Sequence, residues 1–211
     1  MSNLIIDRDL NGKLLEYVHY VYREGEKSAI CIDPGYDTER IFRYIDNKGI
    51  VIDNILLTHG HFDHMLSCKA LQDRFNSNIY ISKIDEEILY NADNNYAILL
   101  HKNEIDKFTV ENIADGDVLN ILGLDIKCIS TPGHTKGGIS FYIESEKVLF
   151  SGDTLFFETH GRTDLYSSSF DEIKDSIVNK LFLLDDDVKV FPGHGKETTI
   201  GYEKINNDIL R

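Results

Sequence analysis

The feature that most constrains this chain is a run of three histidines and one aspartate within six residues. The run reads His59-Gly60-His61-Phe62-Asp63-His64 and follows an apolar segment, Ile52 to Leu57. Three imidazoles and one carboxylate in so short a space are typical of a transition-metal site. The spacing does not fit one helical face, where neighbouring side chains stand three or four residues apart. We therefore expect a loop that leaves the end of a strand and directs its side chains toward metal. The alternative is a polar turn with ordinary histidines.

Three further potential ligands follow at wide intervals, each in a glycine-containing turn after an apolar segment. They are His134, Asp153 and His194. Glycine allows backbone conformations that other residues avoid, so a ligand beside it can be directed back over the end of a strand. Taken alone, each of these turns is ordinary. Together the four turns predict a metal site at one edge of a sheet.

The hydrophobic pattern predicts an α/β fold in which strands and helices alternate. Strands are expected over residues 15–22, 28–32, 52–57, 78–81, 118–122, 124–129, 139–143, 147–150 and 188–191. Helices are expected over residues 38–46, 65–75, 170–181 and 198–210. A polar helical excursion is expected over 85–111, with packing contacts from Ile88, Leu89, Ile98 and Leu99.

Composition narrows the possible partners and the compartment. The net charge is −14, from 36 acidic and 22 basic residues, and nucleic-acid binding draws on a basic surface. No apolar stretch approaches the roughly 20 residues that span a bilayer, and the start of the chain lacks a signal-peptide pattern. We expect a single domain over residues 1–211, in the cytoplasm, with no nucleic-acid or membrane partner. The three cysteines are odd in number and far apart, which argues against a disulfide framework and favours small buried hydrophobes.

On these motifs, the sequence resembles the metallo-β-lactamase superfamily of metal-dependent hydrolases over nearly its whole length. Within that superfamily it is similar to the small, single-domain glyoxalase II (hydroxyacylglutathione hydrolase) type. That similarity rests on residues 151–156, 161–164 and 192–195, with Thr198-Thr199-Ile200 and Glu203. The resemblance implies a four-layered αββα sandwich of two mixed β-sheets flanked by helices. Two departures stand out, because Lys136-Gly137-Gly138 and Asn206-Asn207 differ from what many relatives carry.

The resemblance also implies two divalent metal ions, zinc in the first place, with iron or manganese as alternatives. His59, His61 and His134 would hold one ion. Asp63, His64 and His194 would hold the other. Asp153 would bridge the two ions, together with a water or hydroxide. The remaining histidines, His19, His101 and His160, are expected not to be ligands.

The reaction that the resemblance implies is hydrolysis of a small thioester, such as S-lactoylglutathione, another S-acylglutathione or a related acyl thiol. Metal coordination lowers the pKa of the bridging water to about 7, so hydroxide can attack the carbonyl carbon. A thiolate leaves readily because its pKa is about 8.5. Asp63 and Asp153 are the predicted catalytic carboxylates. Arg162 and Lys136 are the candidate substrate contacts, although Arg162 could equally form an ion pair with Asp164.

Other functions remain open at the level of sequence. A persulfide dioxygenase would hold one iron with His59, His134 and Asp153, which match a two-histidine-one-carboxylate triad. A lactone or phosphodiester hydrolase would use the same hydroxide. A metal-binding module without catalysis is a further alternative, although such modules usually lose ligands. The thiol carrier and the oligomeric state are left open.

Overall fold

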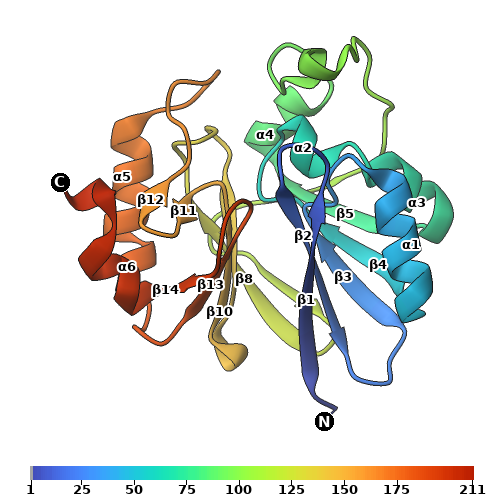
Figure 1. Ribbon diagram of the computed structural model, residues 1–211, viewed down its shortest axis with the longest axis horizontal. Coiled ribbons are helices and arrows are strands. Elements are labelled where there is room, and N and C mark those ends of the chain that lie inside the picture. The colour runs from blue at the N-terminus through green and yellow to red at the C-terminus, as the bar shows by residue number, and fades with distance from the viewer. Residues whose placement is uncertain (1) are drawn as a thin grey trace. The chain divides into compact units, whose positions relative to one another are not determined.

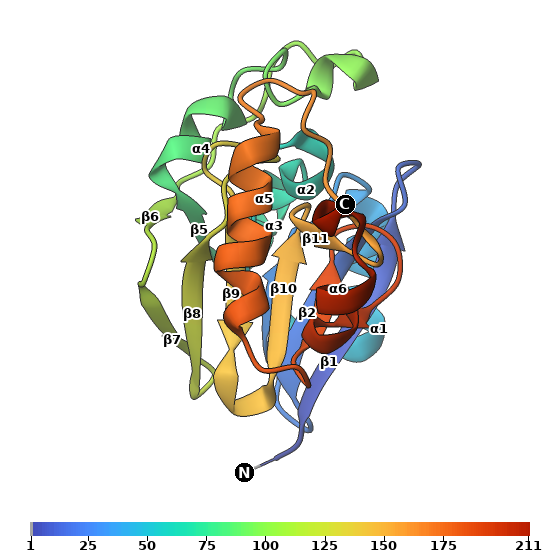
Figure 2. The ribbon, with the colours of Figure 1, turned by 90° about the vertical axis from the view of Figure 1, so that its left-hand side faces the viewer.

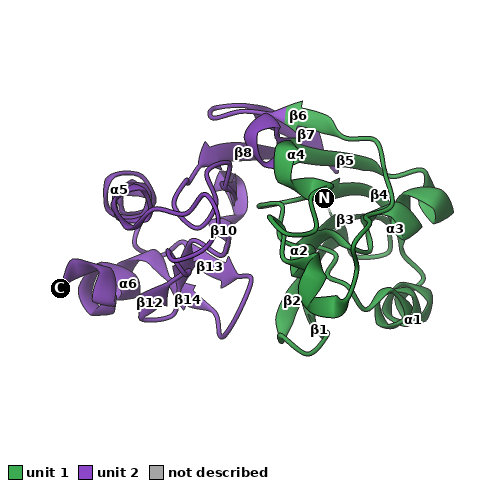
Figure 3. Cartoon of the chain, turned by 90° about the horizontal axis from the view of Figure 1, so that it is seen from above, with its two compact units in different colours: residues 1–81, 86–112 green, residues 82–85, 113–211 purple. Residues whose placement is uncertain are grey.

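Two six-stranded β-sheets and one two-stranded hairpin contain the strands of residues 2–211. The computed structural model describes residues 2–211. By its internal contacts the chain divides into two units, shown in different colours in Figure 3. Unit 1 consists of Met1–Ile81 and Glu86–Asn112, and unit 2 consists of Ser82–Asp85 and Ile113–Arg211.

The sheet of unit 1 has the strand order β1-β2-β3-β4-β5-β6. β1 is antiparallel to β2, and β2 is antiparallel to β3, whereas β3, β4 and β5 run parallel to one another. The carboxyl ends of these three parallel strands therefore lie at one edge of the sheet. The strands are β1 Leu4–Asn11, β2 Glu16–Arg23, β3 Ser28–Ile32, β4 Val51–Leu56, β5 Asn78–Ser82 and β6 Glu111–Ile113.

Helix α1 (Thr38–Lys48) illustrates how the helices of unit 1 form and pack (Figure 1). The Asp37 side chain caps its start by accepting a hydrogen bond from the backbone of Arg40, and Gly49 ends it in the left-handed conformation. Its residues Ile41 and Ile45 are buried in a core that also contains strand residues of β2, β4 and β5. The other helices are α2 Phe62–Met65, α3 Cys68–Phe75, α4 Lys83–Leu89 and the 3-10 helix η1 Ala97–Leu100.

The sheet of unit 2 has the strand order β14-β13-β10-β9-β8-β7. β10 and β13 are parallel, and the other pairs are antiparallel. β11 and β12 form the separate hairpin. The strands are β7 Val118–Ile121, β8 Leu124–Ser130, β9 Ile139–Ile143, β10 Val148–Gly152, β11 Leu155–Phe156, β12 Thr159–His160, β13 Lys189–Pro192 and β14 Thr198–Thr199.

Helix α5 (Phe170–Asn179) covers the sheet of unit 2 along β9 and β10 (Figure 2). Ser169 caps its start, and Ile173 and Ile177 pack in one core with Leu149 of β10 and Val190 of β13. The remaining helices are α6 Ile200–Asn206 and the 3-10 helices η2 Glu144–Glu146, η3 Leu181–Leu183 and η4 Asp208–Leu210.

All nine strands that the sequence predicts are present, with ends that differ by one or two residues, whereas three helical predictions are corrected by the structure. The predicted helix over 65–75 is two helices, α2 and α3, and the closing helix over 198–210 is β14, α6 and η4. The strands β1 and β6 and the β11–β12 hairpin were not predicted.

The predicted helical excursion over 85–111 is wrong beyond Leu89. The side chain of Asn95 donates to the carbonyl groups of Ile88 and Leu89 and so ends α4, because asparagine competes for backbone groups. Only the short η1 follows before β6. Ile88 and Leu89 are buried as predicted, but Ile98 and Leu99 are 40% and 68% exposed.

All three cysteines are buried, and none is paired in a disulfide. Burial raises the pKa of Cys31 and Cys68 well above the usual value, and it raises the pKa of Cys128 to about 12. Within residues 2–211, no helix has both the length and the apolar character that a bilayer span requires.

Candidate metal centre

The four predicted donors of unit 1 lie together after the carboxyl end of β4. His59 and His61 are in the extended segment that leads to α2, where His61 is the N-cap residue, and Asp63 and His64 are in the first turn of α2. All four side chains are buried. The His59 ring centroid is 4.7 Å from that of His61 and 4.1 Å from that of His64. The His64 Nε2 atom is 3.9 Å from the Asp63 Oδ2 atom.

Asp33, at the carboxyl end of the neighbouring strand β3, orients two of these histidines. Its Oδ1 accepts a hydrogen bond from the Thr58 backbone N–H at 2.8 Å. Its Oδ2 accepts from the Thr58 hydroxyl at 2.7 Å and from His64 Nδ1 at 3.0 Å. Because the Thr58 hydroxyl donates to Asp33, it accepts from His59 Nδ1 at 3.0 Å. Both rings are therefore protonated at Nδ1 and carry their lone pair on Nε2, as ligand histidines do.

Asp33 is a candidate functional residue that the sequence motifs do not single out. One of its oxygens lies within 4.8 Å of nitrogen atoms of His59 and His64, which would also suit a ligand. Its two oxygens accept three hydrogen bonds, however, so its chemistry is that of a residue that orients ligands. The sequence does carry a signal for Asp33, because this aspartate directly follows strand β3. β3 runs parallel to β4, the strand that precedes the histidines, so the carboxyl ends of both strands lie at the same edge.

The three predicted donors of unit 2 also lie together. His134 Nε2 is 3.5 Å from Asp153 Oδ2, and His194 Nε2 is 3.6 Å from the same oxygen. Each donor follows the carboxyl end of a strand, namely β8, β10 or β13, and these three strands point the same way because β9 between β8 and β10 is antiparallel to both. The carboxylate of Asp153 therefore lies between the two imidazoles.

The tautomer of His134 is also fixed. Its Nδ1 donates to the backbone carbonyl of Arg162 at 2.9 Å, so the lone pair is on Nε2. The Arg162 carbonyl can come this close because the preceding residue, Gly161, has no side chain. A Cβ atom at Gly161 would lie 1.8 Å from the Asp153 carbonyl oxygen and 3.2 Å from His134 Nδ1. Only glycine fits this approach of the two backbone segments.

Glu203 of α6 holds the hairpin that precedes Gly161. Its buried carboxylate accepts hydrogen bonds from the Glu158 backbone at 2.9 Å, the Thr198 hydroxyl at 2.5 Å and the Asn207 amide at 2.7 Å. Asn207 also donates to the carbonyl of Thr159 at 2.9 Å. The Asn206-Asn207 departure therefore lies in a network that supports the hairpin.

The two candidate substrate contacts are exposed. The Arg162 side chain makes a two-point ion pair with Asp164, with Nε–Oδ1 and Nη2–Oδ2 distances of 2.8 Å. Both side chains are about two-thirds exposed, at 68% and 69%. Lys136 is exposed next to His134, and its backbone N–H is 3.4 Å from the Ser167 hydroxyl.

The other histidines belong to none of the compact His/Cys/Asp/Glu groups found among residues 2–211. His19 is buried in β2, and burial, together with nearby Arg8 and His64, lowers its pKa to about 3. His101 is exposed, and the His160 ring packs edge-on against Phe170.

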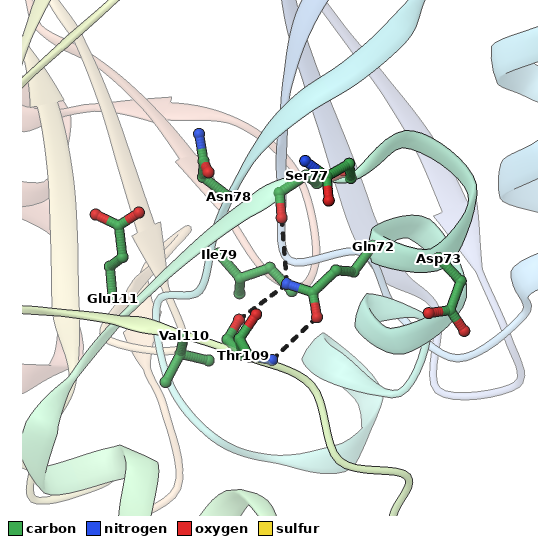
Figure 4. Close-up of a pocket in the computed structure, with 9 residues that line it drawn as sticks. Gln72, Asp73, Ser77, Asn78, Ile79, Thr109, Val110 and Glu111 are labelled. Atoms are coloured by element: carbon green, nitrogen blue, oxygen red, sulfur yellow. Dashed lines mark hydrogen bonds between the residues drawn. The ribbon is translucent and has the colours of Figure 1, made fainter.

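A cavity of about 580 Å³ in unit 1 lies beside α3, β5 and residues 109–111 (Figure 4). The Gln72 side chain bonds there to the backbone of Ser77 and Thr109. None of the described residues that line this cavity is a predicted ligand.

The donor set fits a pair of divalent transition-metal ions. Imidazole nitrogens and carboxylate oxygens are the ligands of zinc, iron and manganese sites in hydrolases. Three of the five histidines are held with Nε2 as the free ligand atom by hydrogen bonds at Nδ1.

Comparison with known proteins agrees with this description. Residues 16–194 match the family described as the metallo-beta-lactamase superfamily. The chain is 35% identical over 189 residues to "Hydroxyacylglutathione hydrolase GloC" of Haemophilus influenzae, and the match covers 89% of both chains.

Two solved structures share the fold. One is "BLEG-1 B3 metallo-beta-lactamase", with a TM-score of 0.91 and 31% identity, covering 98% of this chain and 99% of the other. The second is "TTHA1623 in a di-iron-bound form", with a TM-score of 0.85 and 29% identity, covering 97% of this chain and 100% of the other. The predicted α/β fold class, with two mixed sheets and flanking helices, is confirmed. The chain therefore belongs to the metallo-β-lactamase superfamily.

Proposed function

We propose that this protein is a metal-dependent hydrolase that cleaves small thioesters of the S-acylglutathione type. The observation that carries the proposal is the pair of donor clusters, in which all seven ligand positions of the family pattern are filled and five of the seven donors are buried. The name of the Haemophilus influenzae relative, a hydroxyacylglutathione hydrolase, supports the substrate class.

The proposed assignment of ligands keeps the one implied by the sequence. His59, His61 and His134 would hold one ion, Asp63, His64 and His194 would hold the other, and Asp153 would be shared between them. When bound, such a pair of ions polarises a carbonyl group and supplies hydroxide near neutral pH. Zinc is the first choice, and iron or manganese suits the same donors. The single domain over residues 1–211 is part of this proposal, because the seven donors come from both units.

The protein's own residues then have distinct tasks. Asp33 and the carbonyl of Arg162 keep the Nε2 atoms of their histidines deprotonated. Asp63 and Asp153 supply the negative charge that retains the cations and orients the attacking oxygen. The thiolate leaving group needs little help from a general acid, because its pKa is about 8.5.

We assign the anionic arm of the substrate to Arg162 and Lys136. Both are exposed and both flank the donors of unit 2. Arg162 has to exchange its ion pair with Asp164 for the substrate carboxylate, which an exposed pair does at little energetic cost. We also place the protein in the cytoplasm.

A second candidate is β-lactam hydrolysis, because one of the similar structures is named a B3 metallo-beta-lactamase. A β-lactam is also an acyl compound that hydroxide can open.

The test compares substrates on one preparation. The purified protein is loaded with zinc, iron or manganese, its metal content is measured, and hydrolysis of S-lactoylglutathione and acyl-coenzyme A is followed beside a chromogenic cephalosporin. Oxygen uptake with glutathione persulfide tests the dioxygenase alternative. We expect kcat/KM for a thioester to exceed that for the cephalosporin, without oxygen uptake. Thioester turnover at the background rate by fully metal-loaded protein would rule the proposal out.

A further inference from the structure

A buried aspartate outside the family pattern contacts the loop that carries His134. Asp85 follows β5 in the chain, yet Ser82–Asp85 belongs to unit 2 by its contacts. The Asp85 side chain is 1% exposed. Its Oδ2 accepts a hydrogen bond from the Thr135 hydroxyl at 2.7 Å, and its Oδ1 accepts one from the Gly137 backbone N–H at 2.7 Å. Ser82 fixes the position of Asp85 by accepting from its backbone N–H at 3.1 Å.

We propose that Asp85 is a positioning residue for the metal ligand His134. One carboxylate holds the loop on both sides of Lys136, starting at the residue directly after His134. Hydrogen bonds to a charged acceptor are stronger than neutral ones, and burial protects them from competition with water. This inference rests on the proposed function, because it requires that His134 binds a metal ion.

The glycine at position 137 is explained by the same contact. A Cβ atom there would lie 2.4 Å from Asp85 Oδ1 and 2.4 Å from the Ser82 hydroxyl oxygen. A Cβ atom at Gly138 would lie 2.8 Å from the Thr131 carbonyl oxygen. Gly137 thus lets the loop lie against Asp85, and Gly138 lets the same loop approach the backbone of Thr131.

Asp85 and Arg162 hold His134 at different points. The Arg162 carbonyl accepts from Nδ1 and so sets the plane and tautomer of the ring. Asp85 fixes the backbone after His134, and the Gly133 N–H bond to the Thr135 carbonyl at 2.9 Å closes the turn around it. Loss of Asp85 leaves the tautomer intact and releases the backbone, so Nε2 is no longer held at one position.

Three substitutions separate positioning from a general loss of folding. Asp85→Ala removes both hydrogen bonds. Asp85→Asn keeps both, because its oxygen accepts from Gly137 N–H while its amide donates to the Thr135 hydroxyl, which can reverse its direction. Thr135→Val removes one bond at nearly constant volume. Asp117→Ala is the matched control in unit 2, since Asp117 accepts from the backbone of Ala114 at 2.8 Å in another loop.

The experiment measures zinc affinity by competition with a chromophoric chelator, and the visible spectrum of the cobalt-substituted protein. We expect Asp85→Ala to weaken the affinity of one ion by about 10–100-fold, as is typical when a partner of a ligand is removed. Thr135→Val should give a smaller loss, Asp85→Asn should restore near wild-type affinity, and Asp117→Ala should change nothing. The cobalt spectrum should change for Asp85→Ala and be restored for Asp85→Asn.

His134→Ala, measured in the same series, distinguishes the two ways of failing. If His134→Ala keeps both ions at wild-type affinity, the proposed metal site is wrong. If His134→Ala loses an ion while folded Asp85→Ala and Thr135→Val bind zinc as tightly as the wild type, the inference about Asp85 is overturned. If Asp85→Ala does not fold, Thr135→Val and Asp85→Asn decide. In that case, a zinc affinity of Thr135→Val equal to that of the wild type counts against the inference. A folded Asp85→Asn with a zinc affinity well below that of the wild type also counts against it.

Discussion

The two donor clusters reach similar chemistry by different routes. In unit 1, four donors lie within six residues, and a turn of helix α2 gathers them after one strand. In unit 2, the three donors His134, Asp153 and His194 are spread over about sixty residues and meet because three strands end at one edge. The first cluster is encoded locally, whereas the second depends on the whole sheet. The first should therefore tolerate changes in the distant fold, and the second should be sensitive to backbone packing.

The strongest test of the comparison removes one donor from each cluster. We expect Asp63→Ala and His134→Ala each to lose at least one ion and to lower turnover by at least about 100-fold, more than the loss of a supporting residue. Metal analysis and kcat/KM on the purified variants measure this. Equal losses support one shared centre. Full activity in either variant would show that the residue is not a ligand.

Asp33→Asn should have the next largest effect, about 10–100-fold in metal affinity. The amide of the new side chain would donate to the Thr58 hydroxyl and to His64 Nδ1, where the carboxylate of Asp33 accepts. The Thr58 hydroxyl would then donate to His59 Nδ1. Both the His59 and the His64 ring would therefore take the tautomer that is protonated at Nε2. Asp85→Asn, by contrast, should be nearly silent. Chelator competition on both variants compares them directly, and equal affinities would contradict this reasoning.

Gly161→Ala tests the dependence of unit 2 on backbone packing. The added methyl group overlaps the Asp153 carbonyl, so we expect a loss of about 1–3 kcal/mol in the free energy of unfolding, together with weaker metal binding. Gly116→Ala is the control. Its φ of +82° imposes strain, but no atom lies within 4 Å of the new Cβ. Urea unfolding and metal content should show that only Gly161→Ala affects both.

The smallest effect should come from Asp7, which stabilises unit 1 without contacting its donors. Although burial raises the pKa of Asp7, hydrogen bonds from Lys48, Tyr44 and Tyr22 bring it below the ordinary 3.8. The stabilisation is thus present above about pH 4 and is lost as the pH falls through the lower folded value. We expect Asp7→Asn to cost about 1 kcal/mol at pH 7, because the group is partly exposed.

Urea midpoints of the metal-free protein between pH 3 and 7 check this prediction. The difference between Asp7→Asn and wild type should shrink below pH 4, and metal affinity at pH 7 should stay unchanged. A difference that grew in acid would contradict the sign of the shift.

The contrast between clusters also explains what could be predicted from the sequence. The donors of unit 1 form one short motif that can be recognised in the sequence without the fold. Those of unit 2 can be predicted because each follows an apolar strand and a glycine. Asp33 and Asp85 were not found, because their partners are 25 and about 50 residues away and only the sheet brings them near.

The errors in the fold have similar causes. β1 was missed because it lies at the sheet edge and seven of its eight residues are only partly buried, which weakens the alternation of polar and apolar residues. The region after Leu89 was predicted as helix from apolar spacing, whereas the side chains of Asn91 and Asn95 bond to the backbone and stop the helix.

The three buried cysteine thiols can serve as natural probes of local unfolding in this protein. Two of them, Cys31 and Cys68, lie in unit 1, and Cys128 lies in unit 2. Only the thiolate reacts with alkylating reagents, and burial both shields these sulfur atoms and raises their pKa, so they should stay unlabelled at neutral pH while the chain is folded. Labelling followed by peptide mass mapping would then show which half of the molecule opens first when the ions are withdrawn, with no engineered probe.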